Sequence, residues 1–296
     1  MCGIVGLLLK NSLLNERLGQ LVTPMLVSMG ERGPDSAGLA VFAGEDQGEK
    51  FSLFIEDYHF DWEELVRVLD EKLPGMPLIQ VQGRYARLSL QVGSDALKKC
   101  LKEHFPQVHV LSAGHYIDIY KDIGRPSDIA ERYGFPALRG SHAIGHTRMA
   151  TESAITPSHA HPFTAGEDFC LVHNGSLSNP YSIRRRLERR GIGFQTDNDT
   201  EAACRFIEWR LGDGETLESA LDESFSVLDG FYTLLMGTYD KLALVRDPFA
   251  CKPAVVAETD DYVAIGSEYR ALAHLPDVKH ATLFEPKPEV IYSWNR

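Results

Sequence analysis

The second residue of the chain is a cysteine, and a continuous apolar run from Gly3 to Leu9 follows it at once. An apolar run of this length, ended by Lys10 and Asn11, is typical of a strand that is buried on both faces. We therefore expect the chain to enter its core at the third residue. Removal of Met1 would then leave Cys2 as the first residue, at the end of a core strand.

A terminal cysteine carries a nucleophile and a base on one residue. A free α-amine has a pKa of roughly 7.7–8.0 and a thiol about 8.5, so near neutral pH the amine can take the thiol proton without a histidine. Terminal Thr and Cys nucleophiles of this kind are a known variant of the catalytic triad. The dipeptide Cys2-Gly3 taken alone fits an incidental buried cysteine equally well.

The composition indicates a folded protein of one large domain, because 296 residues with 44% hydrophobic and 24% charged residues can bury a sizeable core. A net charge of −12 argues against a nucleic-acid surface or a polybasic membrane anchor. Five scattered cysteines without C-x-x-C spacing fit reduced thiols. The opening apolar run is too short for a membrane span and follows no basic segment, so we expect a cytoplasmic protein.

The order of periodic segments predicts a mixed α and β fold. Apolar residues at helical spacing predict a helix over residues 13–29, in which Pro24 could mark a break. Strands and helices alternate between about residues 44 and 140, which we interpret as an inserted α+β segment of a single domain, residues 1–296. Further helices are expected over 178–190, 199–211 and 216–228, and further strands over 231–238, 241–246, 254–258 and 262–266.

Seven motifs follow one another along the chain: Cys2–Gly6, Arg32–Gly38, His146–Thr151, His159–Phe163, His173–Gly175, Asp197–Glu201 and Arg246–Pro248. Together and in this order they resemble the class II glutamine amidotransferase family of N-terminal-nucleophile hydrolases. The resemblance runs the length of the chain. It implies an α+β fold of the four-layer αββα sandwich type, with the inserted segment added to it.

The resemblance also implies the chemistry. The Cys2 thiolate would attack the side-chain amide of L-glutamine, and the chain would release ammonia and glutamate through a Cys2 thioester. The tetrahedral oxyanion of that attack needs donors that are fixed in advance. In this sequence they would be the Asn174 side chain and the Gly175 backbone N–H. Asn174-Gly175 taken alone also fits a plain turn between a strand over 169–172 and the helix that follows.

Free glutamine presents an α-carboxylate and an α-ammonium as well. By resemblance Arg148 would take the carboxylate, where a planar guanidinium offers two parallel donors. Asp199 would take the ammonium. Arg148 also fits a surface ion pair, and Asp199 also fits the acidic first turn of a helix. Asp199 could serve both purposes, since a helix terminus and a ligand can use different carboxylate oxygens.

Three further residues match motif positions of lesser weight. Thr151 and His161 match positions that line the glutamine pocket. Arg32 matches a loop beside the nucleophile, where we expect a brace rather than a catalyst. The motif Arg246–Pro248 begins a strand and turn that we interpret as structural.

The histidines suggest a rival site. His142 and His146 have the i, i+4 spacing of metal ligands on a helix. Gly140, Gly145 and the strand-rich surroundings argue against a helix there, and no Glu follows His142. We therefore expect no metal.

A separate partner is implied by the resemblance, because the chain stops at Arg296 without a second domain that uses ammonia. The whole-length resemblance is to stand-alone amidotransferase subunits of glutamate-synthase-like systems, including that of N-methylglutamate synthase. Such partners resemble the FMN and iron–sulfur part of glutamate synthase, so we expect these cofactors in the partner and none in this chain. The nitrogen passed on could be ammonia or methylamine. The isolated chain is expected to hydrolyse glutamine slowly.

Two other functions stay open at this point. An N-terminal-nucleophile amidohydrolase for another amide would not need both Arg148 and Asp199, which only an amino-acid substrate requires. A non-catalytic or regulatory subunit would keep the fold, and replacing Cys2 would then leave the activity of the assembly unchanged.

Overall fold

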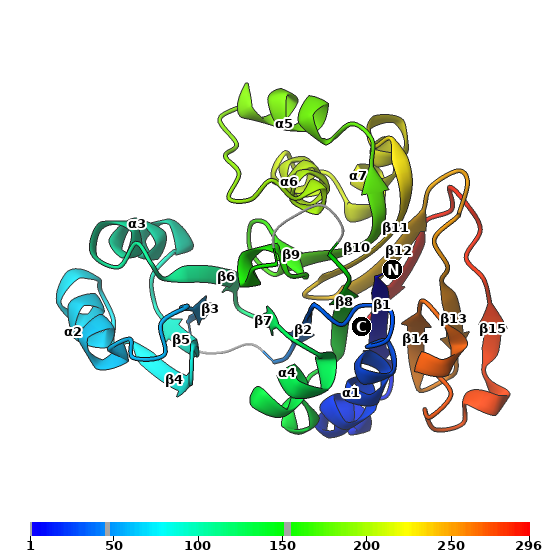
Figure 1. Ribbon diagram of the computed structural model, residues 1–296, viewed down its shortest axis with the longest axis horizontal. Helices are drawn as coiled ribbons and strands as arrows, with labels where there is room; N and C mark the ends of the chain where they lie inside the picture. Colours follow the sequence, from blue (N-terminus) through cyan, green and yellow to red (C-terminus); the bar gives the residue numbers. More distant parts are fainter. Residues whose placement is uncertain (1, 45–47, 151–154) are drawn as a thin grey trace.

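The computed structural model describes residues 2–44, 48–150 and 155–296, and within them two large sheets lie face to face (Figure 1). The first sheet contains, in spatial order, β15 (Thr282–Phe284), β13 (Val255–Glu258), β14 (Tyr262–Gly266), β1 (Gly3–Leu9), β8 (His142–Arg148), β2 (Ser36–Phe42) and β7 (Ile117–Ile123). The second contains β16 (Tyr292–Asn295), β12 (Lys241–Arg246), β11 (Gly230–Thr238), β10 (Phe169–Leu177) and β9 (Phe163–Thr164).

Strand β1 is fully buried and lies inside the first sheet, which confirms the strand expected from the opening apolar run. It pairs antiparallel with β14 on one side and with β8 on the other. A Cβ atom on Gly6 would lie 2.9 Å from a side-chain carbon of Leu235 on the second sheet, so glycine is needed where the two sheets approach. The start of the chain is thus held by both sheets.

Helices cover the outer faces of both sheets. Helix α1 (Leu18–Ser28) packs on β1 and β8, and α4 (Pro126–Arg132) packs on β2 and β7. On the other side lie α5 (Pro180–Glu188), α6 (Asp199–Gly212) and α7 (Leu217–Val227), with α6 against β10. One apolar core joins α1, the first sheet and the inner face of the second, and another joins the second sheet to α5–α7. The order of layers is the expected αββα sandwich.

The insertion is a separate small unit with its own core. Its sheet contains β4 (Leu78–Gln82), β5 (Tyr85–Leu90), β3 (Glu49–Phe54) and β6 (His109–Gly114), and its helices are α2 (Trp62–Lys72) and α3 (Ser94–His104). We expected it to extend to about residue 140. Strand β7 instead pairs with β2 along its whole length, and α4 packs on the sandwich, so the separate unit ends at β6.

Several elements differ from the sequence predictions. The helix expected over residues 13–29 is a 3-10 helix, η1 (Ser12–Arg17), followed by α1, and Pro24 lies inside α1 without ending it. Helix α4 and strands β15 and β16 were not predicted. None of the helices in the described ranges combines the length and apolar character that crossing a bilayer requires.

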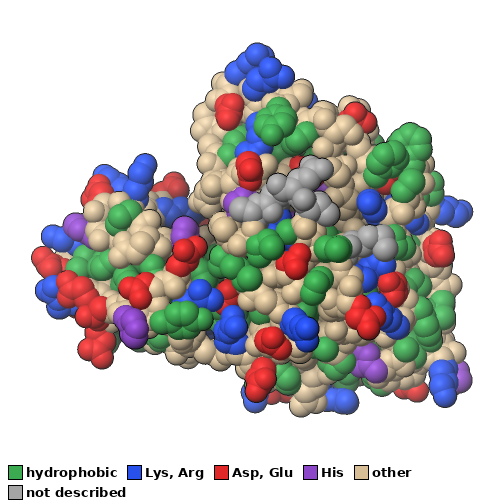
Figure 2. Space-filling view, viewed as in Figure 1, with side chains coloured by type: hydrophobic (Ala, Val, Ile, Leu, Met, Phe, Trp, Pro, Cys, Tyr) green, Lys and Arg blue, Asp and Glu red, His purple; other side chains and the backbone are tan. Residues whose placement is uncertain are grey.

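Buried charges join the insertion to the sandwich. Lys50 on β3 has no exposed surface, and its Nζ lies 3.2 Å from Asp118 Oδ2 on β7. Arg87 Nε on β5 donates to the other oxygen of Asp118 over 3.1 Å. The outer side of the insertion is different, because Asp and Glu side chains gather over α2 in Figure 2. The insertion is thus fixed to the sandwich by ion pairs that are shielded from solvent.

Asp122 on β7 is the most heavily bonded of these groups, with no exposed side-chain surface. It accepts hydrogen bonds from Arg84 Nη2 at 2.8 Å, Arg132 Nη1 at 2.5 Å and the Tyr133 hydroxyl at 2.9 Å. Removal of one partner of a buried pair leaves the other charge uncompensated, which typically costs about 3–5 kcal/mol.

We predict that Asp122→Ala lowers the free energy of unfolding by about 3 kcal/mol, near the lower end of that range because Arg132 is partly exposed. Urea denaturation of the full chain measures this. Glu71→Ala removes an exposed carboxylate on α2 and should leave the denaturation midpoint unchanged. A loss below about 1 kcal/mol for Asp122→Ala would contradict the assignment.

Candidate active site at Cys2

Cys2 directly precedes β1 and is partly exposed. Its carbonyl oxygen accepts a hydrogen bond from Arg32 Nε over 2.9 Å. Arg32 is buried, and its Nη1 lies 2.6 Å from Glu268 Oε1. The hydrogen bond from Arg32 is also the main reason why the pKa of Glu268 is lowered. Arg32 therefore braces the backbone of Cys2 and has its own charge paired on the far side.

Arg148 ends the strand that neighbours β1, since Gly3 pairs with Thr147. Arg148 is 4% exposed, and burial lowers the pKa of its guanidinium. The negative groups that oppose this effect belong to Cys2, Asp35, Asp199 and Asp197, in decreasing order. The structure therefore places Cys2, the buried Arg148 guanidinium and the carboxylate of Asp199 close enough to interact electrostatically, although they come from distant parts of the chain.

Asn174 and Gly175 lie within β10, so the interpretation of Asn-Gly as a turn is wrong. Gly175 has a φ of +148°, and a Cβ atom there would lie 1.9 Å from the carbonyl oxygen of Phe231. Only glycine fits this backbone. Asn174 is buried, and its Nδ2 has no hydrogen-bond partner among the described residues. A buried amide donor without a partner is rare, and it is the group that an oxyanion would use.

Asp199 is the first residue of α6, whose N-cap is Asn198. Its Oδ2 accepts from the backbone N–H of Leu177 over 2.8 Å, and its Oδ1 lies 3.3 Å from the Thr200 hydroxyl. The side chain is one quarter exposed. The carboxylate thus joins the start of α6 to the end of β10, and one face of it stays open toward solvent.

Three histidines form a buried cluster behind Asn174. The rings of His146 and His161 stack with centroids 4.0 Å apart. His146 Nε2 donates to the carbonyl oxygen of His173 over 3.0 Å, and His173 N donates to His161 Nδ1 over 3.4 Å. His173 Nδ1 lies 3.1 Å from the Thr200 hydroxyl. The cluster links β8, β10 and α6.

The remaining expected residues have different positions. His161, expected in the wall of the glutamine pocket, is 5% exposed and supports β10 from behind. Thr151 lies outside the described residues. Sequence analysis did not predict the supporting contacts of His146 and His173, although these residues begin the motifs His146–Thr151 and His173–Gly175. No local sequence pattern predicts these contacts, because the partners lie on other elements of the fold.

The rival metal site does not have the helical geometry that its spacing suggested. His142 and His146 both lie on strand β8. His142 Nε2 donates to the carbonyl oxygen of Thr238 over 2.8 Å. Within the described ranges, no three His, Cys, Asp or Glu side chains are grouped so that they could hold a metal ion.

Comparison with known proteins decides the family. A family model described as "Glutamine amidotransferase domain" matches residues 146–274. Glutamine amidotransferase-like protein GlxB of Rhizobium meliloti (strain 1021) is 47% identical over 298 residues, covering 100% of this chain and 98% of the relative. The chain belongs to the class II glutamine amidotransferase family. A putative glutamine amidotransferase of Methanothermobacter thermautotrophicus (strain Delta H) is 32% identical and covers 99% of both chains.

A solved structure supports the fold of this amidotransferase. Glutamine phosphoribosylpyrophosphate amidotransferase from B. subtilis, complexed with ADP and GMP, superposes with a TM-score of 0.63 at 21% identity. The match covers 99% of the present chain and 49% of that one. The chain thus spans about half the length of that structure, and at this level of identity the likeness concerns the fold alone.

Burial lowers the pKa of four histidines of the amidotransferase, the three of the cluster near Asn174 and His142 at the start of β8. Desolvation lowers the pKa of His142 to about 4 and that of His146 to about 3. It also lowers the pKa of His161 and His173. A base whose pKa is lower in the folded state binds fewer protons there than in the unfolded state. The contribution of these histidines to stability is therefore full above about pH 6.5 and falls as the pH falls toward 4.

We predict that unfolding at pH 5.5 takes up at least about one proton, because His142 and His146 together take up about two and Glu49, whose pKa burial raises to about 7, releases one. The lowered pKa values of His161 and His173 add to this uptake. Calorimetric unfolding in two buffers of different ionisation enthalpy measures the uptake. His142→Gln should lower it by about one proton. An uptake below about one proton in the unchanged chain would contradict the assignment.

Proposed function

We propose that this amidotransferase hydrolyses L-glutamine at Cys2 and passes the nitrogen to a separate synthase subunit. The observation that carries the proposal is the unpartnered Asn174 amide on β10. It lies on the strand whose His173 carbonyl is bound by His146, and His146 pairs with Ile4, two residues after Cys2. The Asn174 donor and the Cys2 nucleophile are thus connected through His146, which pairs with Ile4 and donates to the His173 carbonyl.

The reaction we propose begins after removal of Met1. The α-amine of Cys2 takes the thiol proton, and Sγ attacks the carbon of the glutamine side-chain amide. The oxyanion that forms accepts hydrogen bonds from Asn174 Nδ2 and Gly175 N. The carbon–nitrogen bond then breaks, the amine returns its proton to the leaving nitrogen, and ammonia departs. Water hydrolyses the resulting thioester, which releases glutamate and restores Cys2.

Substrate recognition would rest on two opposite charges. Arg148 takes the α-carboxylate, and the open face of Asp199 takes the α-ammonium. The shared electrostatic neighbourhood of Cys2, Arg148 and Asp199 supports this assignment. It favours glutamine over an amide without an amino-acid end. Arg32 and His161 position the nucleophile and β10, respectively, and touch no substrate in this scheme.

The acceptor of the nitrogen belongs to another chain in this proposal. Two curated relatives have nearly the same span as the present chain, whereas the B. subtilis enzyme is about twice as long. We propose a partner of the glutamate-synthase or N-methylglutamate-synthase type, with FMN and an iron–sulfur cluster in the partner. Slow glutamine turnover by the isolated chain, and faster turnover with the partner, would support this arrangement.

We predict that Asn174→Ala lowers kcat for glutamine by about 100- to 1000-fold while KM changes little, because the lost donor acts on the transition state. Steady-state ammonia release measures both constants. Asn295→Ala, at an exposed position on β16, is the matched control and should match the parent chain. An unchanged kcat in Asn174→Ala would remove Asn174 from the oxyanion site.

We predict that Asp199→Asn erases the preference for glutamine over glutaramate, the same amide without the α-ammonium. The variant can still accept from Leu177 N, so the contact that joins α6 to β10 is kept. A charge-assisted hydrogen bond of about 1.5–3 kcal/mol corresponds to a preference of about 10- to 150-fold in kcat/KM. An equal preference in both proteins would show that Asp199 serves only as the helix terminus.

A further inference from the structure

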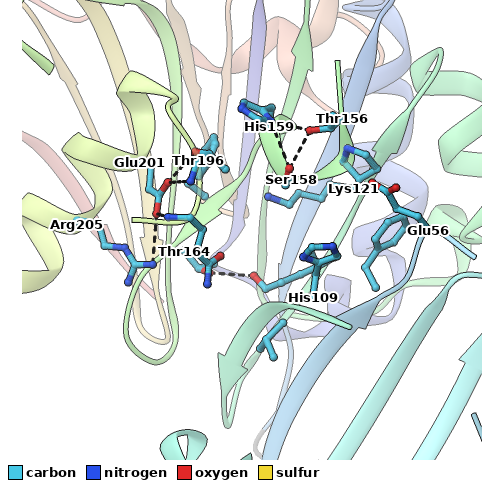
Figure 3. Close-up of a pocket in the computed structure, with 16 residues that line it drawn as sticks. Glu56, His109, Lys121, Thr156, Ser158, His159, Thr164, Thr196, Glu201 and Arg205 are labelled. Carbon is cyan, nitrogen blue, oxygen red and sulfur yellow. Dashed lines mark hydrogen bonds and ion pairs between the residues drawn. The ribbon is translucent and has the colours of Figure 1, made fainter. Parts of the chain in front are cut away.

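A cavity of about 170 Å³ lies where the insertion meets the sandwich, apart from Cys2 (Figure 3). Its walls come from β3, β6, β7, β9, α6 and the short 3-10 helix η3 (Pro157–His159). Cys2, Arg148, Asn174 and Asp199 are not among the described residues that line it. The glutamine site therefore does not account for this cavity.

Lys121 supplies a buried cation on one side of the cavity. Its Nζ donates to the carbonyl oxygens of Ala160 over 2.8 Å and Pro162 over 3.1 Å, and it lies 4.8 Å from the centre of the Phe163 ring. An ammonium has three donors, so two backbone acceptors leave one N–H for a ligand. Burial lowers the pKa of Lys121 to about 8, so the side chain is charged at neutral pH.

Arg205 supplies a second cation from α6, on the opposite side of the cavity in Figure 3. Its Nε is buried without a hydrogen-bond partner among the described residues, and its contact to Glu201 Oε1 is long, at 3.5 Å. Glu201 is already bound by the backbone N–H groups of Gln195 at 2.9 Å and Thr196 at 2.7 Å. Lys121 and Arg205 thus lie near a single carboxylate, that of Glu201, and both oxygens of Glu201 already accept hydrogen bonds from the backbone.

The remaining wall limits what could bind. Phe54, Leu111 and Phe163 contribute apolar surface, and the exposed Glu56 would repel a second negative charge on the ligand. At about 170 Å³ the cavity has room for several waters or one small organic molecule. These walls suit a small ligand with one carboxylate on a short carbon chain that is otherwise uncharged or carries an ammonium group.

We propose that this cavity binds a small monocarboxylate, with its carboxylate between Lys121 and Arg205 and its carbon chain against Phe163. The cationic pair provides charge-assisted donors, and the aromatic ring provides apolar contact. Phosphate fits less well, because a dianion would leave one charge unpaired beside Glu56.

The cavity also has a direct connection to the glutamine site. Lys121 holds the carbonyls on both sides of His161. His161 in turn accepts from the N–H of His173, the residue before Asn174. Occupation of the cavity is therefore expected to change the rate of glutamine hydrolysis. This coupling rests on the proposed function, whereas binding itself does not.

The test is titration calorimetry of the full chain with propionate, L-alanine and inorganic phosphate as separate probes. We expect saturable one-to-one binding of propionate or L-alanine, weakened about tenfold or more in Arg205→Met. Arg67→Met removes an exposed arginine of α2 and should bind like the parent chain. Arg205→Met is preferred to Lys121→Met, because loss of Lys121 leaves two buried carbonyls without donors and could prevent folding.

Three results would overturn the proposal: no saturable binding of either carboxylate, unchanged binding in Arg205→Met, or tighter binding of phosphate than of both carboxylates. The coupling is tested separately by glutamine hydrolysis with saturating probe in the parent chain and in Arg205→Met. Carboxylate binding with an unchanged rate would confirm the site and overturn the coupling. Absence of any glutaminase activity would contradict the proposed function and leave the calorimetry as the test of the site.

Discussion

The pairing of β1 between β14 and β8 is the constraint on which the rest of the structure depends. A strand with ladders on both sides has almost no freedom at its ends, so Cys2 is held in place although it lies next to the chain terminus. Gly6 keeps the second sheet close to this strand, and Arg32 fixes the Cys2 carbonyl from the side. The fold thus holds Cys2 in a defined position.

The second constraint is the contact between the sheets at the histidine cluster. His146 pairs with Ile4 in one sheet and donates to the carbonyl oxygen of His173 in the other, which positions β10 against β1. Burial lowers the pKa of His146 to about 3, so the cluster stays neutral over the pH range in which a thiol and an amine can react. This contact also sets the position of Asn174, the residue that follows His173 on β10.

Much of the fold could be predicted from the sequence, because continuous apolar runs and helical spacing mark β1, α6 and α7 without tertiary information. The limits of the insertion could not be predicted in this way. The sequence pattern of strand β7 does not differ from that of the strands before it, and only its pairing with β2 assigns it to the sandwich. Buried charges such as Lys50 and Asp118 also look like surface residues until their partners are known.

The candidate site shows the same division. The sequence motifs identified Cys2, Arg148 and Asp199 as candidate residues, but they could not predict that these residues lie close together in the fold. Asn174-Gly175 was open to a turn, because local chemistry favours one, and the long pairing of β10 with β11 overrides that preference. The contacts of His173 join two strands, β8 and β10, to helix α6 and to the segment that carries His161. Sequence patterns describe local chemistry well and describe contacts between distant segments poorly.

The central claim is that Cys2 is a terminal nucleophile that acts on glutamine. The most direct measurement is the intact mass of the full chain after incubation with 6-diazo-5-oxo-L-norleucine, a glutamine analogue that alkylates the nucleophile, followed by peptide mapping. The account predicts loss of Met1 and a single adduct on Cys2 that excess glutamine prevents. Retained Met1, or an adduct only on Cys251 or another cysteine, would contradict it.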